Sequence, residues 1–201
     1  MIVPYVVERL AGGGERALDV YSRLLADRIV YLGSAIDDDV ANVVVAQLLH
    51  LESAQPDMPI DLYVNSPGGS PSAMLAIYDA MQYVRSPVFT TCVGQASADA
   101  AVLVAGGAAG SRAILRHARM VLHQPGTQAR GDVPDLILAA DEIVRVRAEL
   151  EEVLSAHTGK DVATLRRDTD RELVLTAEQA VAYGLADRVI VGREGALRRA
   201  G

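Results

Sequence analysis

Three short segments of this 201-residue chain carry residues suited to nucleophilic catalysis. Gly94–Ala101 lies between a strand-like run and a run of small residues with helical character. A sharp strand-to-helix turn exposes one side chain at a helix N-terminus, where negative charge is favoured, and this one offers Ser97 and then Ala98. Asn65–Gly69 follows another strand, and its paired glycines let backbone N–H groups approach a ligand closely, as an oxyanion hole requires. His123 ends an apolar strand and is suited to act as a general base.

Each of these segments also has a purely structural interpretation. A pair of glycines is commonly a plain tight turn, and a helix of small residues can be selected for close packing. A single histidine is more often a structural residue than a catalytic one. The three segments therefore carry functional weight only if the fold brings them together.

The elements that would position them alternate between strands and helices. Strand-like runs cover residues 28–32, 60–64 and 88–93, and amphipathic helices cover 37–53 and 70–84. Such alternation indicates crossover connections and a mainly parallel sheet with helices on both faces, which is an α/β fold. The carboxyl ends of parallel strands share one edge, so the three segments are expected to meet there.

The second half of the chain contains one unusually long helical pattern. It follows short strand signals at 112–115 and 119–122 and a polar loop at 126–131. The pattern runs from Asp132 to His157, which at about 1.5 Å per residue is roughly 39 Å. Its apolar stripe predicts a helix that projects and packs on a partner, although burial within its own subunit is the alternative. Thr176 and Gln179 then form a capping box, which predicts a short helix before a last strand at 187–191.

The ends of the chain are less regular. Residues 1–14 contain Pro4 and close on three glycines, a composition that predicts a mobile N-terminal arm. Apolar residues recur at helical spacing over 15–25, which predicts a helix there. The tail at 193–201 is expected to be loose.

Composition limits the class of protein. The length fits one domain, and a formal net charge of −7, from 19 Lys and Arg against 26 Asp and Glu, argues against a nucleic-acid partner. The single cysteine, Cys92, excludes an intrachain disulfide framework or a cysteine metal cluster, and we expect no metal or cofactor. No apolar run reaches the roughly eighteen residues of a membrane span, so we expect no membrane association and a cytoplasmic location.

Several motifs in register resemble one known family, the proteolytic subunit of the ATP-dependent Clp protease. The resemblance extends from Pro4 to about Val191, and a set of motifs in order is far more specific than any one of them. The motifs are Asn65-Ser66-Pro67-Gly68-Gly69, Ala76-Ile77-Tyr78-Asp79, Gly94-Gln95-Ala96, His123-Gln124-Pro125, His157-Thr158-Gly159, and Leu175-Thr176-Ala177 with Tyr183-Gly184-Leu185.

The resemblance implies an architecture and an assembly. It implies a crotonase-like α/β domain over 15–192, a handle region over about 124–158, and an axial arm over 1–14. It also implies a double ring, two stacked rings of seven subunits, that degrades unfolded protein fed in by a hexameric AAA+ ATPase. Positions that resemble the ATPase docking cleft are Tyr63, Tyr83 and Ile190, and Asp170-Arg171 resembles a charged pair at the ring–ring contact. The alternatives are ordinary packing for the first three and a solvated surface pair for the last two.

The catalytic residues that the resemblance implies carry over unevenly. The family elbow is Gly-x-Ala-x-Ser, and its flanks align here without a gap, so Ala98 stands at the nucleophile's position. His123 matches the family base, and Glu172 stands where the family has an orienting aspartate. The oxyanion hole would come from the Gly68-Gly69 loop and the backbone of Asp99.

These departures differ in their consequences. Glu172 keeps the carboxylate and could still orient an imidazole. Ala98 removes the attacking oxygen, and loss of a triad serine typically lowers turnover about a millionfold. Ser97 is one residue early, so its side chain points about 100° away and would need a backbone shift. A carboxylate at Asp99 would repel negative charge that develops nearby unless it points elsewhere.

Three functions from different classes follow. The first is a serine endopeptidase that uses Ser97, which a fluorophosphonate label on Ser97 would support. The second, which we favour, is a non-catalytic subunit that contributes ring contacts, pores or docking sites to a homomeric or mixed ring. The third is a crotonase-type acyl-CoA enzyme, which the long handle helix and His123-Gln124-Pro125 argue against. An engineered replacement of a serine is another origin for Ala98, although a designed knockout would not need Glu172 as a second change.

Overall fold

A mostly parallel sheet forms the centre of the computed structural model, which describes residues 3–9, 14–126 and 131–192. Its strand order is β3-β4-β5-β6-β9, and β7 pairs with both β5 and β8. All pairings in this sheet are parallel except the antiparallel pair β7–β8. The strands are β3 (Ile29–Leu32), β4 (Ile60–Ser66), β5 (Val88–Ser97), β6 (Arg112–Leu115), β7 (Arg119–Leu122), β8 (Leu173–Thr176) and β9 (Arg188–Ile190). The predicted α/β class is confirmed.

The longest strand, β5, pairs with β6 along one part of its length and with β7 along another. Its residues 90–92 pair with β6, and its residues 95–97 pair with β7. Between these two stretches Gly94 has φ +77°, and a Cβ there would lie 2.8 Å from the side-chain oxygen of Asn65. The glycine thus lets the strand change partners, and the strand continues to Ser97 rather than ending at residue 93 as the sequence predicts.

Helices cover the sheet and begin at the expected caps. Asp37 accepts from the N–H of Val40 at the start of α2, and the predicted capping box of Thr176 and Gln179 opens α7. The helices are α1 (Val20–Ala26), α2 (Asp38–Ala54), α3 (Pro71–Tyr83), α4 (Asp99–Ala105), α5 (Val133–Thr158), α6 (Val162–Asp168) and α7 (Ala177–Tyr183). The short α4 is buried along its whole length, and apart from Asp99 it is built from small and apolar residues.

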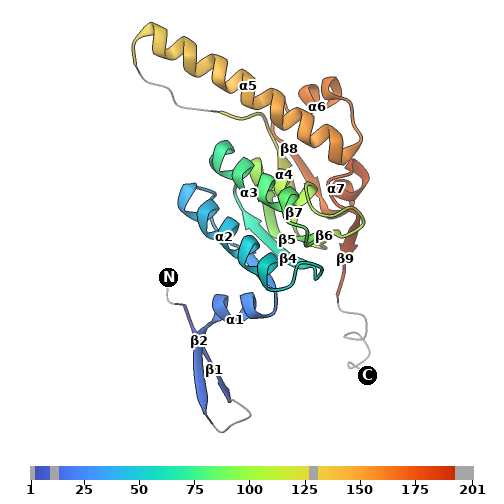
Figure 1. The fold of residues 1–201 in the computed structure, drawn as a ribbon. Coiled ribbons are helices and arrows are strands. Elements are labelled where there is room, and N and C mark those ends of the chain that lie inside the picture. The colour runs from blue at the N-terminus through green and yellow to red at the C-terminus, as the bar shows by residue number, and fades with distance from the viewer. Residues whose placement is uncertain (1–2, 10–13, 127–130, 193–201) are drawn as a thin grey trace.

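The long helix α5 projects from the body of the molecule (Figure 1). Its buried residues, Leu150, Glu151 and Leu154, all lie near its C-terminal end. Its other half carries exposed apolar side chains at Val133, Leu136, Ile137, Leu138 and Val144. The prediction of a long projecting helix is therefore confirmed, and burial within the same subunit holds only for its end. None of the described helices is long and apolar enough to cross a bilayer.

The N-terminal prediction needs correction. Residues 15–25 were expected to form one helix, but Glu15–Asp19 is a strand, β2, paired antiparallel with β1 (Tyr5–Arg9). The helix starts only at Val20, because Asp19 caps it by accepting from the N–H groups of Tyr21 and Ser22. Within the arm predicted for residues 1–14, Tyr5–Arg9 is thus one of two paired strands that extend away from the sheet (Figure 1). Residues 1–2, 10–13 and the tail at 193–201 lie outside the described residues.

Candidate active site

The turn between β5 and α4 has the strained backbone of a nucleophile elbow. Ala98 has φ 49° and ψ −118°, a region that residues with a side chain rarely occupy. Its N–H donates to the carbonyl of Val121 at 2.8 Å, which ties the elbow to β7. Such strain costs about 1–3 kcal/mol and persists where the surroundings impose it. The strand–turn–helix geometry that presents a catalytic hydroxyl is present, with a methyl group at its tip.

Ser97, the adjacent candidate, belongs to the strand rather than to the elbow. It is the last residue of β5, and its backbone pairs with Val121 in β7. Among the described residues, no hydrogen bond joins its hydroxyl to His123. The strand pairing therefore opposes the backbone shift that would bring Ser97 to the nucleophile's position.

The glycine loop packs directly against this elbow. Gly68 has φ +90°, and a Cβ there would lie 2.7 Å from the carbonyl oxygen of Ser97 and 3.2 Å from the Cβ of Ala98. A Cβ on Gly69 would lie 2.0 Å from the carbonyl oxygen of Ile36. Both positions therefore require glycine. The N–H of Gly68 donates to the hydroxyl of Ser66 at 3.1 Å, and the role of this loop as an oxyanion hole stays a prediction.

His123 follows β7 and is exposed beside the elbow. Its Nδ1 is hydrogen-bonded to the carbonyl oxygen of Gln124, the next residue, so Nδ1 carries the proton in this arrangement. His123 and Ala98 line one narrow cavity of about 20 Å³. Its other lining residues are Asp99, Val102, Leu122, Gln124, Pro125, Arg147, Leu150, Glu151, Leu154, Leu165 and Thr169. The fold thus brings the histidine, the elbow and the glycine loop to one place.

Glu172 does not orient His123 in this structure. The antiparallel pairing of β7 and β8 ends with Leu122 opposite Leu173, and His123 and Glu172 are the residues next to that last pair. Glu172 is exposed, and within the described residues no hydrogen bond or ion pair joins it to His123. The histidine is held by a backbone carbonyl where a triad would use the carboxylate.

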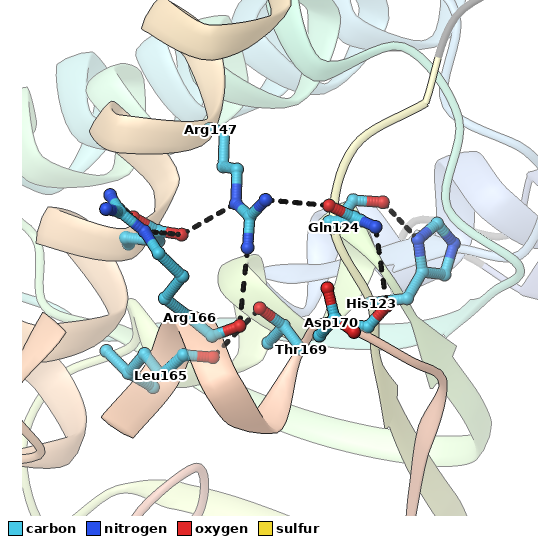
Figure 2. A network of polar contacts seen from close by, with 8 residues as sticks. His123, Gln124, Arg147, Leu165, Arg166, Thr169 and Asp170 are labelled. Carbon is cyan, nitrogen blue, oxygen red and sulfur yellow. Dashed lines mark hydrogen bonds and ion pairs between the residues drawn. The ribbon is translucent and has the colours of Figure 1, made fainter. Parts of the chain in front are cut away.

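Side chains behind His123 anchor the loop after β7. The amide of Gln124 donates to the carbonyl of Asp170 at 3.3 Å, and its backbone N–H donates to the carbonyl of Thr169 at 3.0 Å. Arg147 on α5 donates to the side-chain oxygen of Gln124 at 2.8 Å (Figure 2). The position of the histidine therefore depends on α5 and on the segment before β8.

A buried carboxylate fixes the position of Arg147, the side chain that contacts Gln124. Glu151 on α5 is 4% exposed and accepts from Arg147 at 2.8 Å and from Arg166 on α6 at 2.6 Å. Burial alone would raise the pKa of Glu151, but the two guanidinium groups hold that pKa below its usual value. Sequence reasoning missed this cluster. The i,i+4 spacing of Arg147 and Glu151 could have suggested one pair, whereas nothing in the sequence pointed to Arg166.

Asp99, the first residue of α4, is a second buried carboxyl group at the site, 6% exposed. Burial raises the pKa of Asp99 above its usual value. The backbone N–H of Gly69, the charge of His123 and the N–H of Asp99 itself act to lower this pKa, but burial outweighs them. Asp99 thus lines the same cavity as Ala98 and His123. In the part of the chain that the structure describes, no group of three or more potential metal ligands occurs.

The raised pKa of Asp99 makes the stability of the protein depend on pH. In the folded state Asp99 holds its proton at pH values above the usual pKa of 3.8, whereas in the unfolded chain it loses the proton around pH 3.8. The free energy of unfolding therefore falls as pH rises from 3.8 through the folded pKa of Asp99. We expect Asp99→Asn, which cannot ionise, to melt at a higher temperature than the unsubstituted chain at pH 7, with the difference shrinking towards pH 4. Thermal unfolding followed by circular dichroism at several pH values measures this. A difference that does not change with pH would contradict it.

Comparison with known proteins gives the same family as the motifs. The family described as Clp protease matches residues 12–193. The chain belongs to the Clp protease family. It is 57% identical over 191 residues to the ATP-dependent Clp protease proteolytic subunit 1 of Nocardia farcinica, covering 95% of this chain and 97% of that one. It is 58% identical over 192 residues to the proteolytic subunit 2 of Streptomyces avermitilis, covering 95% and 96%.

Of the docking residues expected for a Clp protease family member, Tyr63 and Tyr83 do not line the cavity that Ile190 lines. Ile190 lines a cavity of about 370 Å³ together with Leu115 and His117 on the C-terminal side of the sheet. Tyr83 is 77% exposed at the end of α3, Tyr63 is half-buried on β4, and neither lines that cavity. Their role in docking stays a prediction.

The charged pair expected at the ring–ring contact of a Clp protease lies on the surface of this subunit. Arg171 Nε and Asp170 Oδ2 are 3.9 Å apart, and their side chains are 94% and 64% exposed. An exposed pair of this kind contributes about 0–1 kcal/mol within one subunit. Both charged groups are thus accessible to a second subunit, and their role in ring pairing stays a prediction.

Proposed function

We propose that this chain is a non-catalytic subunit of a Clp-type ATP-dependent protease. The observation that carries the proposal is the Ala98 elbow, which keeps the strained geometry of a nucleophile's turn without a hydroxyl group. Loss of a triad serine typically lowers turnover about a millionfold, so the other triad positions cannot compensate. The intact scaffold around the elbow supports a structural contribution to the protease.

The alternative, a serine endopeptidase that uses Ser97, has less support. Ser97 would have to leave its pairing with Val121 to approach His123. Family membership and the projecting α5 also favour a protease subunit over an acyl-CoA enzyme.

The proposed assembly is a double ring, homomeric or shared with a catalytically active subunit. The exposed apolar residues on α5 support contacts between rings, because such residues gain stability when a partner covers them. We propose an AAA+ Clp ATPase as the partner that feeds unfolded protein into the chamber, and the cytoplasm as the location. The names of the relatives, ATP-dependent Clp protease proteolytic subunits, support the link to ATP-dependent proteolysis.

A peptidase assay tests the proposal. The purified full-length chain should hydrolyse no fluorogenic peptide by itself, and Ser97→Ala should give the same trace. The chain should also co-elute with an active Clp proteolytic subunit on a sizing column. Hydrolysis by the unsubstituted chain that Ser97→Ala abolishes would overturn the proposal in favour of the endopeptidase.

A further inference from the structure

Two of the family motifs lie outside the candidate active site and meet at the base of α5, residues 150–158. Tyr78 on α3 belongs to the first motif, and His157 in the last turn of α5 belongs to the second. The hydroxyl oxygen of Tyr78 and Nε2 of His157 are 2.8 Å apart, and the two rings stand edge to face with their centroids 5.7 Å apart. We propose that this contact, the α5 latch, is pH-sensitive: it fixes the base of α5 and opens when the ring of His157 takes up a proton.

The base is the part of α5 that is attached to the body of the subunit. The buried residues of α5 all lie near this end. Arg112 on β6 donates to the backbone carbonyl of His157 at 3.1 Å, and a Cβ on Gly184 would lie 2.8 Å from the carbonyl oxygen of Thr158. A helix of 26 residues is about 39 Å long, so a rotation of about 10° at its base moves the far end by about 7 Å. Contacts at the base therefore set the direction of the whole helix.

A proton on the His157 ring acts against this contact in two ways. In the neutral ring Nε2 can accept the hydrogen of the Tyr78 hydroxyl group, whereas in the charged ring both nitrogens are donors and the hydroxyl group has to turn and accept. The charged ring also places a second positive charge near the guanidinium group of Arg112. Burial and the charge of Arg112 lower the pKa of His157 below its usual value of 6.5. The folded subunit therefore favours the neutral ring and the closed latch.

The surroundings of the latch determine how a proton reaches it. Charged groups on the elements around it are Asp79, Arg85, Arg112, Lys160 and Asp187. Arg112 is paired with Asp187 at 2.6 Å, Lys160 lies over the ring of Tyr183, and Asp79 is exposed to water, which screens its charge. His157 and the exposed Arg85 line one cavity of about 360 Å³, and none of the described residues that line it is acidic. Water can thus bring a proton to the ring, and no carboxylate in this cavity compensates the charge.

Opening of the latch would act on the half of α5 that projects. This half carries the exposed apolar side chains of α5. In the proposed function these side chains contact a second ring, so acidification weakens the contacts between rings. Only this consequence rests on the proposed function, because the latch itself lies within one subunit.

Hydrogen exchange of the full-length chain, followed by mass spectrometry at pH 7.5 and pH 5.5, measures the opening. After correction for the intrinsic pH dependence of exchange, peptides from the base of α5 should exchange several-fold faster at pH 5.5. His157→Gln should lose this difference, because its amide keeps an acceptor but takes up no proton. His50→Gln is the matched control, a change at an exposed histidine on α2, and should keep the difference. Glu151 in the same peptides does not interfere, because its pKa lies below 4.5.

Tyr78→Phe tests the latch without a change of pH. It removes the hydroxyl group and keeps the ring, so the base of α5 should already exchange several-fold faster at pH 7.5. Unchanged exchange in Tyr78→Phe would overturn the latch, and so would a pH difference that persists in His157→Gln. If circular dichroism shows that His157→Gln does not fold, the Tyr78→Phe comparison decides. Neither negative result touches the proposed function, which the peptidase and co-elution assays test separately.

Discussion

Replacing Arg112 by alanine is expected to lower the free energy of unfolding by about 3–5 kcal/mol, the usual cost of breaking a buried ion pair. The Arg112 guanidinium group is buried and bonds both carboxylate oxygens of Asp187, the closest at 2.6 Å. It also donates to the carbonyls of Ala105, His157 and Gly184, which lie at the C-terminal ends of α4, α5 and α7. The substitution would remove the guanidinium donors of these helix ends and of Asp187, whose carboxylate would keep the hydrogen bond from the backbone N–H of residue 112.

Urea titration followed by circular dichroism measures the loss. Arg188→Ala is the matched control, because Arg188 lies on β9, the strand next to β6, but is exposed and donates to the carbonyl of Gly110 at 2.9 Å. That variant should lose less than about 1 kcal/mol. Arg112→Lys should recover little, since a point charge cannot make the forked bonds of a guanidinium. A loss for Arg112→Ala as small as for Arg188→Ala would contradict the role given to Arg112.

Glu151→Ala is expected to cost about 3 kcal/mol, because it removes the carboxylate that joins Arg147 on α5 to Arg166 on α6. The same contact contributes a pH dependence. Because the folded pKa of Glu151 lies below its usual value of 4.5, its stabilisation is complete above pH 4.5 and is lost as pH falls below it. The substitution should also release Arg147 from its place beside Gln124, and so loosen the loop that carries His123.

Glu149→Ala provides the comparison for Glu151. Glu149 lies on the same helix and pairs with Arg145, but both side chains are about half exposed. Its loss should cost no more than about 1 kcal/mol. Urea titration at pH 7 and pH 4 tests both effects. Equal costs for the two glutamates, or a cost for Glu151→Ala that is the same at pH 4, would contradict this account.

The strand–helix alternation of the central fold could be predicted because each element carries its own signal. The period of apolar residues and the caps at Asp37 and Thr176 lie within the elements they define. The strand at Glu15–Asp19 could not be predicted in the same way, because its residues have helical spacing and become a strand only by pairing with Tyr5–Arg9. The seven-residue α6 was missed because it is too short to show a period.

The features of the candidate site also fall into those that the sequence could predict and those that needed the structure. The flanks of the elbow were enough to align Ala98 with the nucleophile's position, since they follow a local motif. The burial of Asp99 depends on how a separate loop covers the elbow, which no local pattern shows. The bonding of His123 to the Gln124 carbonyl rather than to Glu172 likewise depends on side-chain direction. Sequence therefore predicted which residues meet, and the structure was needed for how they face each other.

The central claim is that the elbow has no group that can attack a carbonyl. Treatment of the unsubstituted full-length chain with a fluorophosphonate, followed by peptide mass spectrometry, tests it most directly. We predict no adduct on any serine of the elbow peptide, because Ala98 has no oxygen and Ser97 is held in β5. A stoichiometric adduct on Ser97 would contradict the account.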